Sequence, residues 1–384
     1  MQHQTLIPHF HLPRKQLWIA LTVIFMLLIG LRLYVCFFSG LPNWHRDTGD
    51  YFSQADALLA GGYVNYFPNG LPAIIALLKW ITPHHTDQTL LWLHVCMAAG
   101  TGWFIYRICT VVFRNDWIAL LALLLLAIFP TQVNLTRWLT SEVSSTFFLT
   151  AAYYYYLKKN HYASGVLFAF ATLIRTEFIF IVGLLLFFEL IRKKRLNWRL
   201  MITLFIPLFL TGMYCKSKTG KFAIAGHSKV NILFSVTASG ENIDWDYVDK
   251  HPEIKTEKEA LQLYFKRMRN EPGPFFKDRW LNFWEMWGYP SSAKGTRGNT
   301  ERTIIFLGNI LMLAGGLFTC WKNRKRFEVI ILAFPFVVIT GLHIMMMALQ
   351  RYVFPAEPFM IALVAYMLLY MLYGLRAKKV IRNV

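Results

Sequence analysis

Residues 16–62 read QLWIALTVIFMLLIGLRLYVCFFSGLPNWHRDTGDYFSQADALLAGG, an apolar run followed at once by a polar segment with two aspartates, Asp47 and Asp50. A membrane-spanning helix needs about 20 mainly apolar residues, and the stretch 16–38 has that length. It ends without a small-x-small cleavage pattern, so we expect a retained helix rather than a signal peptide. The two aspartates then lie in a loop at the membrane surface.

The same apolar pattern recurs along the chain. Of its 384 residues, 56% are hydrophobic and only 16% are charged, whereas soluble domains carry about 25% charged residues. Together with shorter helices between them, these stretches predict an all-α integral membrane protein with a bundle of about ten transmembrane helices. The other long apolar stretches are 88–113, 116–133, 200–215, 303–321, 327–349 and 357–375.

Membrane topology explains the net charge of +19 better than nucleic-acid binding does. The basic residues cluster between apolar stretches, as in RKKRLNWR at 192–199, and loops rich in Lys and Arg stay in the cytoplasm. This rule predicts cytoplasmic N- and C-termini and two short helices on either side of a break at Arg175-Thr176-Glu177. It also predicts that 39–87 and 216–302 face outward. Short inner loops and the lack of added domains indicate a bacterial inner membrane.

We expect three parts along the chain. Residues 1–215 form an N-terminal transmembrane body that includes the first outer loop, 39–87. Residues 216–302 form a folded extracytoplasmic segment between the seventh and eighth spans, and 303–384 form the C-terminal transmembrane helices.

Short helices are predicted in both outer regions. Turn-forming residues in GGYVNYFPNG separate two helices of the first outer loop, 49–60 and 71–81, which are expected to lie at the membrane interface. In the outer segment an aromatic stripe at helical spacing either faces the headgroup layer or packs on the bundle. It consists of Phe276, Trp280, Phe283, Trp284 and Trp287.

Ionisable side chains at the edge of a membrane bundle are costly unless they are paired or solvated, so each is a candidate for function. Asp47 suits proton removal from a hydroxyl or metal binding. Asp50 suits the same roles, or caps or charges the first turn of the helix that follows. The outer-side candidates are Asp47, Asp50, Arg137, Glu142, Arg175, Glu177, Arg351 and Glu357.

Arg137, Arg175 and Arg351 face outward against the orientation bias. A guanidinium matches the geometry of a phosphate, so the three arginines are predicted to form a pocket for an anion beside the aspartates. The alternative for Arg351 is an interface residue that extends toward the headgroups. Glu142 either opens a helix capped by Thr140 or Ser141, or pairs with Arg137.

No cofactor is required by the sequence. It contains no Walker A, GxSxG or HExxH pattern, and its five cysteines have no zinc spacing. His84 and His85 are adjacent in a turn and point apart, so they make a poor metal site with Asp87. The sequence neither requires nor excludes a divalent metal at Asp47.

Five stretches of the sequence carry a family resemblance: RDTGDYFSQADALLAGG, YFPNGLPAIIALL, LTSEVSSTFFLTAAYYYYL, YASGVLFAFATLIRTEF and LQRYVFPAEPFM. In this order they resemble the GT-C superfamily of integral-membrane glycosyltransferases, above all the protein O-mannosyltransferase and aminoarabinose-transferase branch. The family's Tyr-Pro-Pro-Gly-x-Pro element looks reduced here to Phe67-Pro68-Asn69-Gly70-Leu71-Pro72, and the basic residue that usually precedes it in the aminoarabinose branch is absent.

The resemblance implies a GT-C-type bundle that transfers a hexosyl or pentosyl group, with inversion, from a polyprenyl-phosphate donor. The acceptor is a hydroxyl of a lipid, glycan or protein on the outer, periplasmic face. Asp47 is the implied catalytic base and Asp50 the second choice. The donor phosphate would meet Arg175, Arg351 and Arg137, with Tyr51, Glu142, Glu177 and Tyr352 in supporting positions.

Two other functions use the same residues. A transporter or flippase for lipid-linked or anionic substrates would use the charges as a path, and a catalytically inactive GT-C-like protein would act as a scaffold. Clustering of the charges at one face, without two repeated halves that contain broken helices, argues against a transporter. The expected partners are the lipid-linked donor, the acceptor and membrane lipids, and no nucleic acid.

Overall fold

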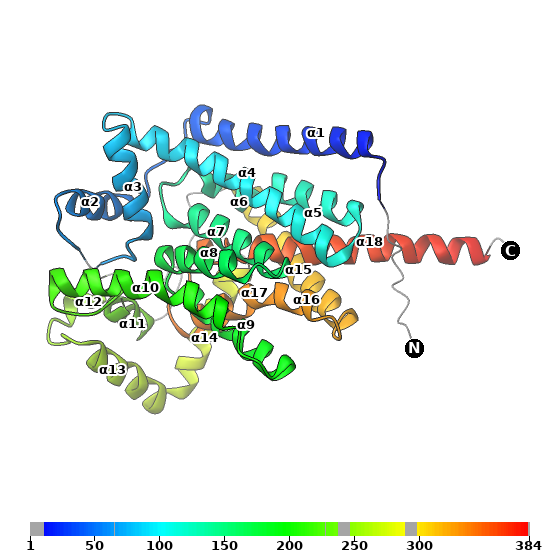
Figure 1. The fold of residues 1–384 in the computed structure, drawn as a ribbon. Helices are drawn as coiled ribbons and strands as arrows, with labels where there is room; N and C mark the ends of the chain where they lie inside the picture. The colour runs from blue at the N-terminus through cyan, green and yellow to red at the C-terminus, as the bar shows by residue number, and fades with distance from the viewer. Residues whose placement is uncertain (1–10, 65, 227, 237–245, 289–297, 383–384) are drawn as a thin grey trace.

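The computed structural model describes residues 11–64, 66–226, 228–236, 246–288 and 298–382. Within these residues every regular element is a helix, so the predicted all-α architecture is confirmed. Figure 1 shows the long helices packed side by side in a bundle. The helices at 48–59, 70–81, 228–236 and 247–270 lie at one end of the bundle, whereas the start of the first helix and the end of the last helix lie at the other.

Six helices of the described residues are long and apolar enough to cross a membrane, or seven if a bent pair is counted as one span. They coincide with the apolar stretches predicted from the sequence. They are α1, Arg14–Leu33, continued by η1, Tyr34–Phe38; α4, Thr86–Phe113; α10, Trp198–Thr219; α15, Asn299–Lys322; the run of α16, Phe327–Ile330, η4, Ile331–Ala333, and α17, Phe334–Met345; and α18, Glu357–Arg382.

The bent pair lies in the predicted stretch 116–133. Helix α5, Asp116–Ile128, is followed at 59° by α6, Pro130–Asn134, and η2, Leu135–Arg137. The break falls at Phe129, whose ψ of 123° is extended, because a residue before proline is pushed out of the helical region.

A buried arginine of α1 satisfies the carbonyl groups at this break. Arg32 Nη1 donates to Ala127 O at 2.7 Å, and Nη2 donates to Leu126 O at 2.9 Å. The last carbonyls of a helix lack partners within the helix, and no water reaches them inside a membrane. Arg32 therefore supports the bend that leads the chain toward the first outer loop.

Three shorter helices complete the body. Helices α7, Ser141–Leu157, α8, His161–Ile174, and α9, Phe178–Lys193, have 17, 14 and 16 residues. The predicted break at 175–177 is confirmed, because α8 ends and α9 begins there. The predicted total of about ten crossings depends on these three helices and stays a prediction.

The first outer loop contains both helices that its sequence predicts. They are α2, Thr48–Leu59, and α3, Gly70–Ile81, whose ends agree with the predicted ranges to within one residue. Helix α3 packs closely on α8, since a Cβ added at Gly70 would lie 2.6 Å from the Leu173 carbonyl oxygen. This contact fixes the first outer loop against the body.

The outer segment contains α11, Ser228–Val236, α12, Tyr247–Lys250, α13, Glu257–Asn270, and α14, Pro272–Trp287. Residues 227, 237–245 and 289–297 of the predicted segment lie outside the described residues. The predicted aromatic stripe has two parts, because Phe276 and Trp280 are each 58% exposed whereas Trp287 is fully buried. Packing on the bundle is confirmed for Trp287, which contacts Phe336 and Thr340, and contact of the exposed part with the headgroup layer stays a prediction.

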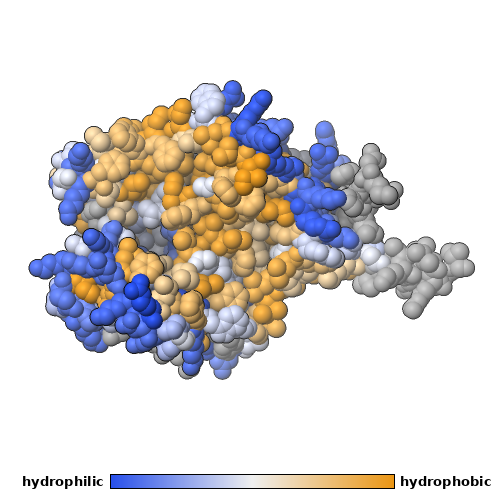
Figure 2. All heavy atoms as spheres, turned by 90° about the horizontal axis from the view of Figure 1, so that it is seen from below, coloured by the Kyte–Doolittle hydropathy of each residue, from blue (hydrophilic) through white to orange (hydrophobic). Residues whose placement is uncertain are grey.

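The surface has the polarity of a membrane protein. Figure 2 shows hydrophobic side chains across the middle of one face and hydrophilic side chains gathered toward its ends. On α10, for example, Phe205, Phe209 and Leu210 are exposed. So much exposed apolar area is expected where lipid is the solvent.

Close helix packing yields a test of this fold. A Cβ at Gly165 of α8 would lie 2.6 Å from the Leu200 carbonyl oxygen of α10, whereas Gly183 of α9 has open space around it. We expect Gly165→Ala to destabilise the protein by about 1–3 kcal/mol and Gly183→Ala to leave it unchanged or slightly more stable. Melting temperatures in detergent would measure this, and equal values for both variants would contradict the α8–α10 contact.

Candidate functional site

Asp47 and Arg351 form a close ion pair, although 304 residues separate them in the sequence. Arg351 Nη2 donates to Asp47 Oδ2 at 2.6 Å. Arg351 Nη1 lies 3.2 Å from His45 Nδ1, and the Asp47 backbone N–H donates to the same nitrogen at 3.3 Å. Because both neighbours are donors, His45 Nδ1 acts as an acceptor and carries no proton.

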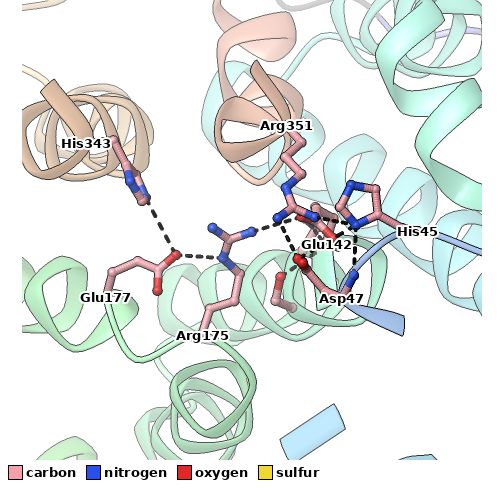
Figure 3. A network of polar contacts seen from close by, with 9 residues as sticks. His45, Asp47, Glu142, Arg175, Glu177, His343 and Arg351 are labelled. Carbon is pink, nitrogen blue, oxygen red and sulfur yellow. Dashed lines mark hydrogen bonds and ion pairs between the residues drawn. The ribbon is translucent and has the colours of Figure 1, made fainter. Parts of the chain in front are cut away.

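Further charged residues continue from this pair. Glu142 Oε1 lies 3.7 Å from Arg351 Nε and 3.5 Å from Arg175 Nη1. Arg175 Nε donates to Glu177 Oε1 at 2.6 Å, and His343 Nε2 lies 3.9 Å from that oxygen. Figure 3 shows acidic and basic groups alternating in space. We call the following set the ion-pair network: His45, Asp47, Glu142, Arg175, Glu177, His343 and Arg351.

The network gathers residues from helix ends and connections. Asp47 precedes α2, and Glu142 lies in the first turn of α7. Arg175 and Glu177 occupy the break between α8 and α9, where the backbone leaves its helical path. His343 lies in the last turn of α17, and Arg351 in η5, Gln350–Val353. Segments far apart in sequence therefore meet at one end of the bundle.

The turn before α2 directs the Asp47 carboxylate at Arg351. Asp47 occupies the N-cap position but its side chain makes no capping hydrogen bond. Thr48 supports the turn instead, since its hydroxyl accepts from His45 N at 3.0 Å and donates to Leu139 O at 3.4 Å. Asp50 lies in the first turn of α2. Its predicted first-turn role is confirmed, and its predicted role as a cap is wrong.

Two tyrosines border the network. The Tyr352 ring lies 5.3 Å from the Arg175 guanidinium and 5.6 Å from that of Arg351, and it stacks on His343 at 4.3 Å. A cation over an aromatic face is attracted by the ring quadrupole, so Tyr352 orients both arginines. Tyr51 is buried and stacks on Phe67 at 4.6 Å.

Carboxylates and guanidiniums alternate in the network. Three carboxylates face two guanidiniums. The Glu142 side chain is only 3% exposed, and its Oε2 has no hydrogen-bond partner among the described residues. Both arginines of the network are thus already paired with carboxylates.

The surroundings shift several pKa values. Burial and the Arg351 guanidinium lower the pKa of His45 below its usual 6.5, in agreement with its role as an acceptor. Burial opposes ionisation of Glu177, but Arg175 and His343 outweigh it and lower the pKa of that carboxyl. Partial burial and the Asp47 carboxylate raise the pKa of Asp50. Asp50 is exposed whereas Asp47 is half-buried, and Asp50 lies outside the ion-pair network.

Arg137 does not join the ion-pair network. Its Nη1 donates to the Pro42 carbonyl oxygen, and its guanidinium lies 5.9 Å from the Trp138 ring. The predicted pair between Arg137 and Glu142 is wrong, because Glu142 faces Arg175 and Arg351 instead. Arg137 thus supports the loop before α2, and its predicted contact with an anion stays a prediction.

His45 and His343 belong to the network but are not among the residues predicted from the sequence. His45 stands two residues before Asp47 in the polar segment that follows the first apolar run. His343 is the ionisable residue at the outer end of the apolar stretch 327–349. Applying the rule for ionisable residues at a membrane edge to histidine as well would have found it.

In the part of the chain that the structure describes, no group of three or more His, Cys, Asp or Glu side chains is placed to hold a metal ion.

Glu357, another of the predicted residues, forms a buried hydrogen bond away from the network. It is fully buried and accepts from Gln132 Nε2 at 2.8 Å. It therefore links α6 to the start of α18.

Known proteins share this arrangement of helices. Residues 67–215 match the family model described as dolichyl-phosphate-mannose-protein mannosyltransferase. The archaeal oligosaccharyltransferase AglB from Archaeoglobus fulgidus, solved with an inhibitory peptide and a dolichol-phosphate, aligns over 95% of this chain at 12% identity and a TM-score of 0.52. The apo form of the A. fulgidus oligosaccharyltransferase also covers 95%, at 11% identity and a TM-score of 0.54. No curated protein matches the sequence.

The chain has the GT-C glycosyltransferase fold. The predicted resemblance to GT-C integral-membrane glycosyltransferases is thereby confirmed. The chain spans about half the length of the archaeal proteins, 51% and 52% in the two alignments. At these identities the similarity to solved structures establishes the fold, while the reaction has to be argued from the residues of the site.

The His45 environment predicts a pH dependence. Because the pKa of folded His45 lies below its unfolded value near 6.5, its contribution to stability is full above that value and is lost as the pH falls through the folded pKa. Wild type should therefore lose more thermal stability than His45→Gln between about pH 7.5 and pH 5.5. Melting curves of both proteins would measure the difference, and equal losses would contradict a neutral, buried His45.

Proposed function

We propose that this protein is a membrane glycosyltransferase that moves a sugar from a polyprenyl-phosphate donor to an acceptor hydroxyl. The observation that carries the proposal is the ion-pair network, in which Arg351 pairs both with Asp47 of the first outer loop and with Glu142, within a GT-C fold. Of the neighbours, AglB was solved with a dolichol-phosphate. A lipid-linked phosphate sugar as donor is consistent with a site at the end of an apolar bundle.

The chemistry follows from a carboxylate beside two guanidiniums. Asp47 takes the proton of the acceptor hydroxyl while the oxygen of that hydroxyl attacks the anomeric carbon. The bond between that carbon and the phosphate oxygen breaks, and the polyprenyl phosphate leaves with the bonding electrons. Arg351 and Arg175 stabilise the charge that develops on the phosphate. Attack in line with the leaving group inverts the anomeric centre.

The ion pairs imply that the donor activates the base. A carboxylate paired to an arginine is a weak proton acceptor, because the nearby positive charge favours its ionised form. A donor phosphate that binds Arg351 Nη2 competes with Asp47 Oδ2 for the same donor. Once displaced from Arg351, the Asp47 carboxylate can meet the acceptor hydroxyl. Asp50, whose pKa is raised, is the alternative base.

Glu142 has a separate role in this proposal. Its Oε2 is buried without a hydrogen-bond partner among the described residues, and an unsatisfied buried acceptor is costly. A sugar hydroxyl that donates to this oxygen would remove that cost. Glu142 thus holds Arg175 and Arg351 through Oε1 and offers Oε2 to the substrate.

We place the reaction on the outer, periplasmic face of a bacterial inner membrane, with both termini in the cytoplasm. This orientation rests on the excess of Lys and Arg in the segments at the other end of the bundle. The division into 1–215, 216–302 and 303–384 belongs to the same proposal. The acceptor would be a lipid, glycan or protein hydroxyl that approaches from the aqueous side.

Purified protein incubated with a panel of radiolabelled polyprenyl-phosphate sugars tests the function directly. We expect transfer or hydrolysis of at least one member. Binding and turnover of none of them would leave a transporter or an inactive scaffold as the better reading.

Substitution of the aspartates tests the base. We expect Asp47→Asn to lower transfer by a factor of about 100 to 10,000, with donor binding retained, because the amide cannot accept the proton. Asp50→Asn should cost much less, and Asp249→Asn in exposed α12 serves as a control. Radiolabel transfer by each variant is the measurement. Loss in Asp50→Asn alone would make Asp50 the base, and full activity of both would rule out this mechanism.

Substitution of the arginines tests the phosphate contact. Arg351→Lys keeps the charge but loses the planar fork, so we expect the donor KM to rise about tenfold or more. Arg137→Lys should change it by less than about twofold, because Arg137 lies outside the network. Initial rates over a donor concentration series give both values. An equal rise in donor KM for both variants would show that Arg137 also contacts the donor phosphate.

A further inference from the structure

Side chains of the outer segment bind the end of α17 through its backbone. Asn282 Nδ2 donates to the carbonyl oxygens of Ile344 and Met346, both at 2.8 Å. Arg279 Nη1 and the Tyr264 hydroxyl both donate to Met345 O at 2.6 Å. We call Tyr264, Arg279 and Asn282 the clamp.

The clamp occupies a position where a helix needs partners. The last carbonyls of α17 have no intrahelical donors, and the end of a helix attracts cations such as Arg279. All three clamp residues are buried, so water does not substitute for them. Arg279 also donates through Nη2 to Ser235 O of α11 at 3.0 Å. The clamp therefore ties α11, α13 and α14 to the end of α17.

Apolar contacts strengthen this attachment. The Met346 side chain packs against the core of the outer segment, which includes Leu233, Tyr264 and Phe275. At the end of α14, Trp287 Nε1 donates to Thr340 Oγ1 at 3.0 Å. Helix α14 contacts both α17 and η5. Met346, the residue that follows α17, thus packs in the core of the outer segment.

The clamped residues lead directly into the ion-pair network. His343 Nδ1 lies 3.0 Å from Met347 O, and a carbonyl can only accept, so this nitrogen carries the proton. The His343 ring stacks on Tyr352, and Arg351 is the residue before Tyr352. Only three residues lie between Met347 and Arg351, so the clamped residues 344–347 are directly connected to the guanidinium that pairs with Asp47.

We propose that Tyr264, Arg279 and Asn282 are positioning residues that couple the outer segment to the candidate site by holding the connection 344–353. A change in the outer segment then moves Arg351 without touching the substrate. The catalytic consequence of this coupling rests on the proposed glycosyl transfer. The mechanical coupling itself does not.

Three variants test the coupling. Asn282→Leu has a similar volume but loses both donors, Tyr264→Phe loses one hydroxyl and is the milder change, and Lys277→Ala on the exposed face of α14 is the matched control. Backbone hydrogen exchange in 346–353 is the first measurement. We expect it to rise about tenfold or more in Asn282→Leu, less in Tyr264→Phe and not at all in the control.

Binding of a polyprenyl phosphate without sugar is the second measurement. Weaker binding in both clamp variants than in Lys277→Ala, with faster exchange in 346–353, supports the proposal. Faster exchange confined to α13 and α14, or a loosened connection with unchanged binding, overturns it. If Asn282→Leu does not fold, Tyr264→Phe decides.

Failure of the proposed function gives a different pattern. Wild type would then bind no polyprenyl phosphate, while exchange in 346–353 would still report whether the clamp holds the connection. Unchanged exchange in the clamp variants overturns the coupling whatever the protein binds.

Discussion

Charges at the edge of an apolar bundle must be compensated within the protein. Asp47 and Arg351 compensate each other in an ion pair that joins the first outer loop to the connection before the last helix. A buried charge without a partner costs several kcal/mol. Glu142 and Arg175 extend the compensation to the middle of the sequence. The first outer loop, the break between α8 and α9 and the connection before α18 are thereby fixed relative to one another. An anion that enters the site competes with these carboxylates for the two arginines.

Much of this arrangement was predictable from the sequence, because the controlling patterns are local. Apolar length gave the long helices, the turn residues of GGYVNYFPNG separated α2 from α3, and the orientation rule located the break at Arg175. Asp47, Arg351, Arg175 and Glu142 were selected as ionisable residues at the membrane edge. The structure brings these four together.

Which residues contact one another in the folded chain could not be predicted from the sequence. Nothing local distinguishes Arg137, which binds the Pro42 carbonyl oxygen, from Arg351, because both are arginines in outer connections. His45 and His343 enter the network through contacts made by other segments. The clamp of Tyr264, Arg279 and Asn282 recognises backbone carbonyls, which every residue has. Such contacts leave no pattern in the order of residues.

The distance of 304 residues between Asp47 and Arg351 also has a consequence for biosynthesis. A chain is made from its N-terminus, and its segments fold in that order. Asp47 is synthesised long before Arg351, so most of the helices are made before this ion pair can form. The network closes only when the connection before α18 has been made. A nascent or truncated chain that lacks this connection has no assembled site.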